Sequence, residues 1–279
     1  MRKITQLLPV LIAMLIFSCS GNKSENSNNV KTDTPVEEET EVKQVLLNVK
    51  KNARLIGPKR TAEQNLVDND IKNIDQSKNP LYGYWVGMFG KNKINIAISN
   101  IENDSIFGYS VCAGNYRKIA GTIRSSSPQV YDVVMLEPGD DQYDGKFEFT
   151  IDEAKKELNG KWAPYKNTVQ PKTYSLKKRN FRYDPSLGEF PEASEEYLEP
   201  MQVENFKTEE IELYRNMIYA RHGYSFTNLK IRRIFDGLDW YIPMSTDIRQ
   251  NLTDIEVHNI DMMYNYEDYY EEYYNSFGR

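Results

Sequence analysis

Between residues 80 and 183, apolar side chains recur at every second position in short runs separated by turn residues. In the segment 93–98, three isoleucines alternate with Lys, Asn and Ala, and the segments 131–135 and 147–152 follow the same period. Such alternation predicts strands with one buried face. We count about eight strands in this region, each joined to the next by a short turn. An antiparallel up-and-down meander of this size protects its edges best by closing into a small β-barrel.

Six large side chains in these strands are candidates for the barrel interior, and their bulk favours a filled interior. They are Trp85, Phe107, Tyr131, Phe147, Phe149 and Trp162. On the first predicted strand, Gly83-Tyr84-Trp85 resembles the G-x-W opening of lipocalin-like barrels. The resemblance implies a barrel of the kind that can enclose a small apolar ligand.

Past the predicted barrel, the apolar spacing changes to that of helices. Thr208 is expected to cap a helix that Gly223 ends in a left-handed conformation. A second helix is expected over about residues 228–235. A third begins at Thr253, where Glu256 completes a capping box. The predicted fold class is therefore α+β, an up-and-down β-barrel followed by a small three-helix module.

Two strings in the helical region carry a family resemblance. They are Arg215 to Phe226 (Arg-Asn-Met-Ile-Tyr-Ala-Arg-His-Gly-Tyr-Ser-Phe) and Trp240 to Pro243 (Trp-Tyr-Ile-Pro), and together they resemble the YARHG family. The resemblance implies an α domain over residues 190–264, in a family that occurs in bacterial lipoproteins. No activity is established for that family, so the resemblance implies a location and a fold without a mechanism. Met217 stands where an acidic residue is common, which could remove a partner for a neighbouring arginine.

The N-terminus combines a basic start with an apolar run over residues 7–17. A run of this length suits a signal peptide and is too short to span a bilayer as a helix. The string Ile16-Phe17-Ser18-Cys19 resembles the lipobox of bacterial lipoproteins, although Phe17 is bulkier than the usual residue. The resemblance implies that residues 1–18 are removed and that Cys19 is acylated. The lipid bilayer would then be a permanent partner of the chain.

Residues 19–79 are expected to form an acidic flexible tether followed by an unassigned segment. Removal of the two basic residues of the signal peptide would lower the formal net charge from −6 to −8. Such a surface repels nucleic acid, which we therefore do not expect as a partner. Cys112 is the only other cysteine. We expect it to be a buried, unreactive thiol outside any intramolecular disulfide.

Arg215, Tyr219, Arg221 and His222 are the candidate ligand-binding residues. At 100° per residue, Arg215 and His222 lie on the same side of the helix as its core isoleucines. A buried cation needs a partner, so Arg215 requires a carboxylate or carbonyl inside the module, or it lines a pocket for an acidic ligand. Arg221 and His222 could instead satisfy carbonyls at the helix end. A buried structural network and a binding site are both compatible with these residues.

No metal or cofactor is expected. The acidic loop 137–145 contains Asp140, Asp141 and Asp144, which are weak candidates for calcium because oxygen-rich loops suit that ion. Their spacing matches no EF-hand. Residues 265–279 alternate tyrosines with acids. We interpret them as an extension of the third helix laid on the barrel or on the α module, with stacking on sugars or on a partner protein as the alternative.

The sequence contains none of the familiar catalytic or zinc motifs, and both of its histidines lie in the helical region. We therefore expect a non-enzymatic envelope lipoprotein, a binding or scaffolding module for envelope proteins or for wall or surface glycans. A lipocalin-like carrier of a small apolar ligand is the alternative, and a carboxylate-based hydrolase is a third reading. Ser20 after the lipid site, without an acidic export signal in residues 20–24, indicates an outer-membrane position that faces the periplasm.

Overall fold

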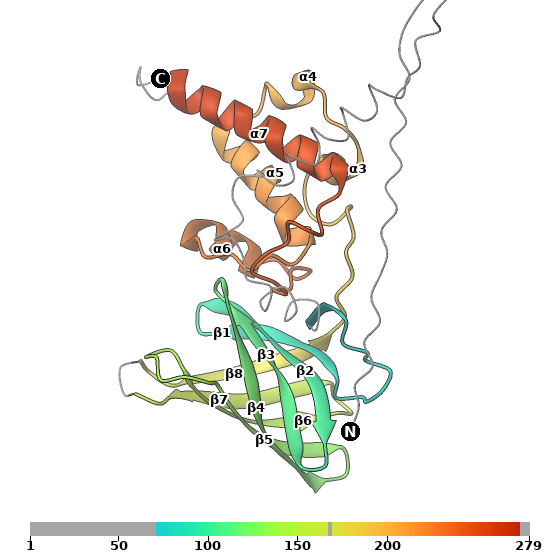
Figure 1. Cartoon of the computed structure of the whole chain (residues 1–279), viewed down its shortest axis with the longest axis vertical. Coiled ribbons are helices and arrows are strands. Elements are labelled where there is room, and N and C mark those ends of the chain that lie inside the picture. Colours follow the sequence, from blue (N-terminus) through green and yellow to red (C-terminus); the bar gives the residue numbers. More distant parts are fainter. Residues whose placement is uncertain (1–70, 167–168, 274–279) are drawn as a thin grey trace, which may run out of the picture.

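The computed structural model describes residues 71–166 and 169–273 (Figure 1). The predicted signal segment, Cys19 and most of the predicted tether lie outside these residues. None of the helices among these residues combines the length and the hydropathy of a membrane-spanning segment. A β-barrel forms one half of this part, and a group of helices forms the other (Figure 1).

Eight strands form the barrel, as the alternating pattern predicts. They are β1 (Gly83–Phe89), β2 (Asn92–Glu102), β3 (Ser105–Cys112), β4 (Asn115–Ser127), β5 (Val130–Leu136), β6 (Gly145–Asp152), β7 (Glu157–Pro164) and β8 (Lys172–Arg179). Each strand pairs antiparallel with the next, and β8 pairs with β1 to close the barrel. Closure leaves the sheet without an exposed edge.

The barrel interior is packed with side chains, in agreement with the prediction of a filled interior. Trp85 is fully buried, and its indole Nε1 donates to the carbonyl of Leu81 at 3.1 Å. Phe107 is the exception among the six interior candidates, because its side chain is 39% exposed on the outside. Its neighbour Ile106 fills the inward position on β3, and successive side chains in a strand point to opposite faces. Tyr131 is only partly buried against the same core.

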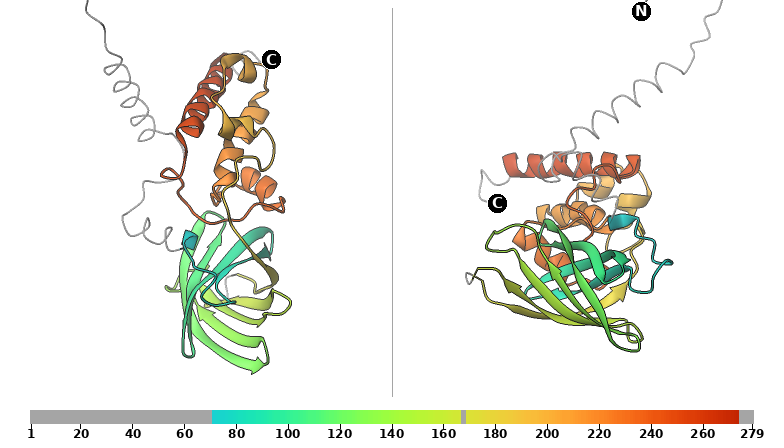
Figure 2. Two further views of the ribbon diagram at one scale, coloured as in Figure 1. Left: turned by 90° about the vertical axis from the view of Figure 1, so that its right-hand side faces the viewer. Right: turned by 60° about the horizontal axis from the view of Figure 1, so that its bottom comes forward.

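Five helices form the second half, which we call the helical domain. They are α3 (Glu192–Glu195), α4 (Pro200–Val203), α5 (Thr208–Arg221), α6 (Leu229–Asp236) and α7 (Asp254–Tyr273). The three longer helices are the predicted ones. The two short helices were not predicted, because a single turn is too brief to show a helical period. In Figures 1 and 2, α6 and the loop after it are the parts of this domain nearest the barrel.

The helix ends confirm most of the predicted caps. Gly223 ends α5 with φ of +75°, and Thr253 and Glu256 form the capping box of α7, with N–H to side-chain oxygen distances of 2.9 and 3.1 Å. The prediction for Thr208 is wrong, because it is the first helical residue and Lys207 occupies the cap position. There the carboxylate of Glu210 accepts from the backbone N–H of Lys207 at 2.8 Å.

One prediction about the barrel surface is also wrong. The alternation in β2 predicted one solvent-facing side, yet Lys93, Asn95 and Ala97 on that side are all buried. The helical domain covers them, so both faces of β2 are buried over residues 93–98. An apolar group that we call the interdomain cluster fills this contact. Its buried members are Ile71, Tyr84, Val86, Ala97, Tyr109, Val111, Ile242 and Met244.

Candidate functional site

Arg215 has a carboxylate partner within its own domain. Its Nη2 lies 3.0 Å from Glu267 Oε1, and its Nε also faces both carboxylate oxygens, at 3.2 and 3.3 Å. The ring of Tyr264 lies 4.0 Å from the guanidinium carbon. Glu267 belongs to the segment that the sequence analysis separated as a C-terminal extension. The end of α7 is therefore needed to neutralise a buried cation of α5.

Arg221 holds the loop before α3 against α5. Its Nε donates to the carbonyl of Leu187 at 2.8 Å, and its Nη2 donates to the carbonyls of Glu189 and Phe190 at 2.8 and 3.0 Å. Its Nη1 donates to Ser194 Oγ at 2.8 Å. The side chain is only 1% exposed, although it borders an open hollow of about 430 Å³. Four acceptors of the chain itself thus satisfy this guanidinium.

His222 contacts the carboxylate of Glu256, which connects α7 with α3 and with the end of α5. Its Nε2 lies 2.7 Å from Glu256 Oε2, and its ring stacks on Tyr183 with centroids 4.3 Å apart. Glu256 also accepts from Ser194 Oγ at 2.8 Å and from the hydroxyl of Tyr183 at 3.1 Å. Burial opposes ionisation, but the hydrogen bond and charge of His222 and the backbone N–H of Thr253 hold the pKa of Glu256 below its ordinary value.

Glu256 is the residue whose role the sequence analysis missed. A capping box already accounts for a glutamate at the start of α7, and this motif does not indicate a further partner. A signal was available, because Glu256 precedes Ile260 by four residues and Met263 by seven, which places all three on one helix face. A carboxylate on a buried face requires partners. Here the same side chain caps α7 and binds His222, the residue that follows α5.

The structure buries all four predicted ligand-binding residues. Arg215, Arg221 and His222 are paired with groups of the same chain, and Tyr219 lies in the hydrophobic core beside them. A glycan-binding site should expose these side chains, whereas a scaffold should bury them. The observed pairing favours the structural network, and the ligand-binding role stays a prediction.

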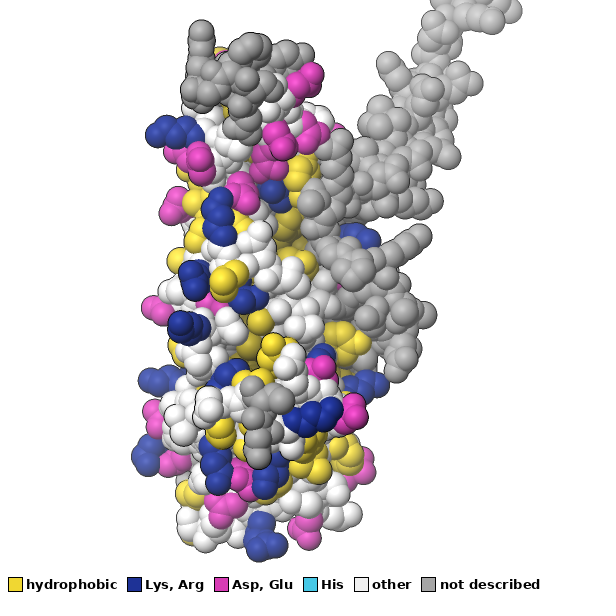
Figure 3. All heavy atoms as spheres, turned by 90° about the vertical axis from the view of Figure 1, so that its left-hand side faces the viewer, with side chains coloured by type: hydrophobic (Ala, Val, Ile, Leu, Met, Phe, Trp, Pro, Cys, Tyr) yellow, Lys and Arg dark blue, Asp and Glu magenta, His cyan; other side chains and the backbone are white. Residues whose placement is uncertain are grey.

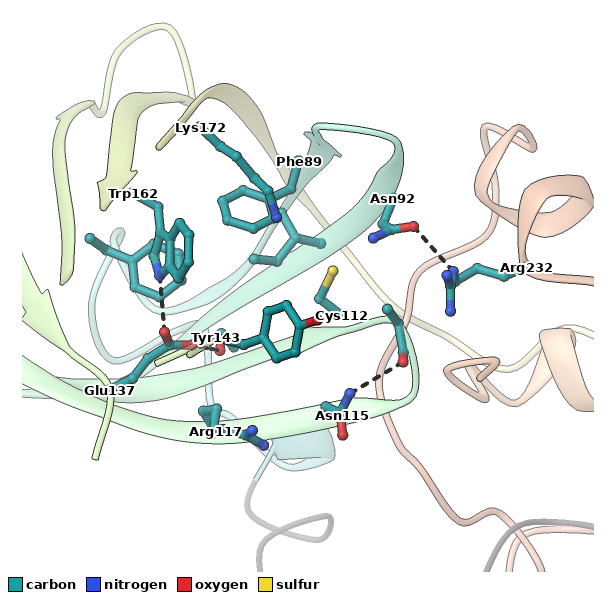
Figure 4. A pocket seen from close by; sticks show the side chains of 14 residues that line it. Phe89, Asn92, Cys112, Asn115, Arg117, Glu137, Tyr143, Trp162, Lys172 and Arg232 are labelled. Atoms are coloured by element: carbon teal, nitrogen blue, oxygen red, sulfur yellow. Dashed lines mark hydrogen bonds between the residues drawn. The ribbon is translucent and has the colours of Figure 1, made fainter. Parts of the chain in front are cut away.

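A second arrangement of polar groups lies at the mouth of the barrel. A cavity of about 380 Å³, the barrel-mouth cavity, opens between strands of the barrel and α6 (Figure 4). Pockets for small ligands have volumes of roughly 300–1,000 Å³. Fourteen residues line it: Phe89, Asn92, Ile94, Ser110, Cys112, Ala113, Asn115, Arg117, Glu137, Tyr143, Phe147, Trp162, Lys172 and Arg232. Arg232 is the only one of them that comes from the helical domain.

Glu137 is the buried carboxylate of this cavity. It accepts from Trp162 Nε1 and from the backbone N–H of Gly145, both at 2.9 Å, and from Ser110 Oγ at 3.3 Å. Burial raises the pKa of Glu137, and these hydrogen bonds offset only part of that effect. Figure 4 shows its side chain turned toward Trp162 at one side of the cavity.

Two cations reach the cavity from opposite sides. The ammonium of Lys172 lies 4.3 Å from the ring centroid of Phe89 and 5.3 Å from that of Trp162. Arg232 donates its Nε to Asn92 Oδ1 at 3.1 Å and its Nη1 to the carbonyl of Thr227 at 2.9 Å. Among the described residues, neither cation has a carboxylate within ion-pair distance. The aromatic rings and backbone therefore hold both charges in place without neutralising them.

Cys112 lies between these two cations on the cavity wall. It has no disulfide partner among the described residues and is half-buried rather than fully buried as predicted, and desolvation raises the pKa of its thiol to about 12. The thiol is therefore protonated at neutral pH, which agrees with the expected unreactive character.

The acidic loop does not bring its three aspartates together. The side chain of Asp140 is 99% exposed and lies 3.8 Å from Lys166. Asp144 is buried, where it binds Arg117 at 3.0 Å and accepts from the backbone N–H of Asp141 at 3.0 Å. Within residues 71–166 and 169–273, no three metal-ligating side chains converge. The positions of these carboxylates thus offer no preformed calcium cage.

Tyr266, Tyr269 and Tyr270 of the C-terminal segment lie along α7, on the helical domain. The hydroxyl of Tyr270 donates to the carbonyl of Glu204 at 2.6 Å, and that of Tyr266 donates to the carbonyl of Pro200 at 3.4 Å. Tyr269 is exposed. Of the two alternatives raised for this segment, packing of an extended third helix on the α module describes Tyr266 and Tyr270.

Comparison with known proteins identifies the helical domain. Residues 189–268 match the YARHG domain family. The match extends past the predicted boundary at residue 264 and includes Glu267, the partner of Arg215. No curated protein and no solved structure matches the chain.

Proposed function

We propose that this chain, whose helical domain is a YARHG domain, is a non-enzymatic scaffolding lipoprotein of the cell envelope. Acylation of Cys19 would attach it to the outer membrane on the periplasmic side, and the acidic tether after Cys19 would hold the two domains away from the lipid. The barrel and the YARHG domain would present their surfaces to envelope proteins or glycans as one rigid unit.

The observation that carries this proposal is the buried polar contact between the two domains. Asn95 Nδ2 donates to the carbonyl of Pro243 at 3.0 Å, and the backbone N–H of Lys93 donates to Asp236 Oδ2 at 2.9 Å. The ammonium of Lys93 also donates to the carbonyl of Tyr241 at 3.2 Å. Buried polar groups accept few alternative geometries, so these bonds set one orientation of the domains. A fixed orientation is what a scaffold requires.

The exposed surface offers contacts on both domains. Basic and acidic side chains are mixed along the face drawn in Figure 3, which differs from the basic surface of a nucleic-acid binder. Large apolar side chains are exposed at Tyr197 and Met201 of the YARHG domain and at Phe107 and Leu136 of the barrel. These four side chains are the positions that we propose as contact points for a protein partner.

Site-specific crosslinking in intact cells tests the scaffold. A photoreactive amino acid at Met201, and in a second variant at Leu136, should give adducts of discrete mass. The exposed Lys177 of β8 is the matched control position and should give none. Equal, unspecific adducts from all three positions would contradict a defined partner. Cys19→Ala tests the anchor, because it should move the chain from the membrane fraction to the soluble fraction.

A second candidate function is that of a small-ligand carrier, and the barrel-mouth cavity favours it. A ligand that is apolar throughout does not suit this cavity, because Lys172, Arg232 and Glu137 line it. Native mass spectrometry of the protein isolated from its own cells would detect a carried molecule as added mass. A spectrum that contains only the acylated chain would count against the carrier.

A further inference from the structure

We propose that the barrel-mouth cavity binds a small organic anion with a flat apolar body, and that Arg232 of the YARHG domain forms part of the site. The ligand would place its ring system against the aromatic wall and its anionic group near Lys172 and Arg232. This proposal rests on the carrier function and is independent of the scaffold.

The apolar half of the site is an aromatic cluster. Phe89 lies 5.8 Å from Trp162 and 6.1 Å from Phe147, measured between ring centroids. Tyr174 packs behind them, 5.6 Å from Phe89. The close-up in Figure 4 shows the rings of Phe89 and Trp162 on the same side of the cavity. Aromatic walls with such tilted packing accept a further flat ring in an offset or edge-on arrangement.

The charged half of the site consists of Lys172 and Arg232. Lys172 directs its ammonium into the cavity (Figure 4). Arg232 uses its Nε and Nη1 for bonds within the chain, so its Nη2 has no hydrogen-bond partner among the described residues. An anion between these groups would gain more than it would at an open surface, because the enclosing walls lower the local dielectric constant.

The remaining charges of the lining leave this positive character in place. Arg117 is paired with Asp144, so these two charges cancel. Glu137 is held by three neutral donors, and its carboxylate is turned toward Trp162, across the cavity from Arg232 (Figure 4). The lining therefore carries two cations without an ion-pair partner among the described residues and one carboxylate. This excess of positive charge favours an anionic ligand over a cationic one.

The matched dyes 8-anilinonaphthalene-1-sulfonate and N-phenyl-1-naphthylamine test the proposal, since they share a flat aromatic body and only the first is charged. Both are titrated into the full mature chain carrying Cys19→Ser, which is isolated without lipid or detergent. The sulfonate should bind saturably at one site. Lys172→Gln and Arg232→Gln should each weaken its binding about tenfold, or about 1.4 kcal/mol, without weakening that of the neutral dye.

Charge-matched controls separate the site from net charge. Lys177→Gln on the same strand and Arg233→Gln on the same helix remove equal charge from exposed positions, and neither should change sulfonate binding. Lys172→Arg keeps the positive charge and should retain binding. This variant distinguishes loss of the charge from a disturbance of the fold by Lys172→Gln. Unsaturable binding, or equal losses in the site and control variants, would overturn the proposal. A negative result in the dye titrations would not affect the crosslinking experiment or the scaffolding function that it tests.

Discussion

The side-chain amide of Asn95 in β2 donates to the carbonyl oxygen of Pro243 in the YARHG domain across 3.0 Å. Asn95 is completely buried, and its Oδ1 has no hydrogen-bond partner among the described residues. The outer face of β2 would face water if the helical domain did not cover it. Here one of its polar side chains is hydrogen-bonded to that domain. Because this bond joins the two domains, a substitution at Asn95 tests whether their relative orientation is fixed.

Asn95→Ala should destabilise the contact between the domains. The substitution leaves the buried carbonyl of Pro243 without a donor, which costs about 1–3 kcal/mol. Calorimetry should show the single unfolding transition of the original chain broaden or divide into two. Asn159→Ala, at an exposed position of β7, is the control and should leave the transition unchanged. A single unshifted transition in Asn95→Ala would contradict a rigid two-domain unit.

Gly223→Ala should destabilise the YARHG domain. Gly223 adopts φ of +75°, and an added Cβ would lie 2.7 Å from Met244 Cγ and 3.0 Å from the carbonyl oxygen of Ile242. The left-handed conformation alone costs roughly 1–2 kcal/mol for a residue with a Cβ, and the contacts add to it. Chemical denaturation measures the loss. Gly237, which ends α6, has an ordinary negative φ, so Gly237→Ala should have a much smaller effect.

The pairing of Arg215 with Glu267 should appear in a double-mutant cycle. Arg215→Gln and Glu267→Gln should each reduce the free energy of unfolding, because each leaves a mostly buried charge unpaired. The double variant should lose less than the sum of the two, with a coupling of about 0.5–3 kcal/mol. Lys230 and Glu212, an exposed pair 2.6 Å apart, form the control cycle and should show less coupling. Strict additivity at Arg215 and Glu267 would contradict the contact.

Acid should weaken the YARHG domain through Glu256. The folded-state pKa of this carboxyl is lowered from its ordinary value of 4.5. Its ionised form therefore adds stability above about pH 4.5, and that stability is lost as the pH falls through the folded-state pKa. Denaturation between pH 7 and pH 3 measures the effect. Glu256→Gln should be less stable at pH 7 and should lose less on acidification, and parallel pH curves for the two chains would contradict this role.

Local patterns were enough to predict most of the secondary structure. The two-residue period of the segment 93–98 identified a strand, and Gly223 and Thr253 marked the ends of helices. These features depend on bonds between neighbours along the chain or in the next strand, so their residue types are visible in a short window. The Thr208 cap was wrong by one residue, which is the usual scale of ambiguity at a helix end.

The candidate site was only partly accessible to the same reasoning. Helix periodicity placed Arg215 and His222 on a buried side and required partners for them, but it could not name Glu267 and Glu256. Those partners lie on α7, 52 and 34 residues away in the chain. Only the packing of α7 against α5 decides which carboxylate reaches which cation.

The periods, the turns and the helix ends follow from the amino-acid sequence, since short-range hydrogen bonding and the burial of one face dictate them. The tertiary structure alone decided what covers the second face of β2 and which helix brings Arg232 to the mouth of the barrel. From its local sequence, a side chain such as Lys93 is expected to face solvent. It is buried because the surface of the helical domain, distant in the chain, covers it. Burial at such positions results from the contact between two folded surfaces, and no local pattern records that contact.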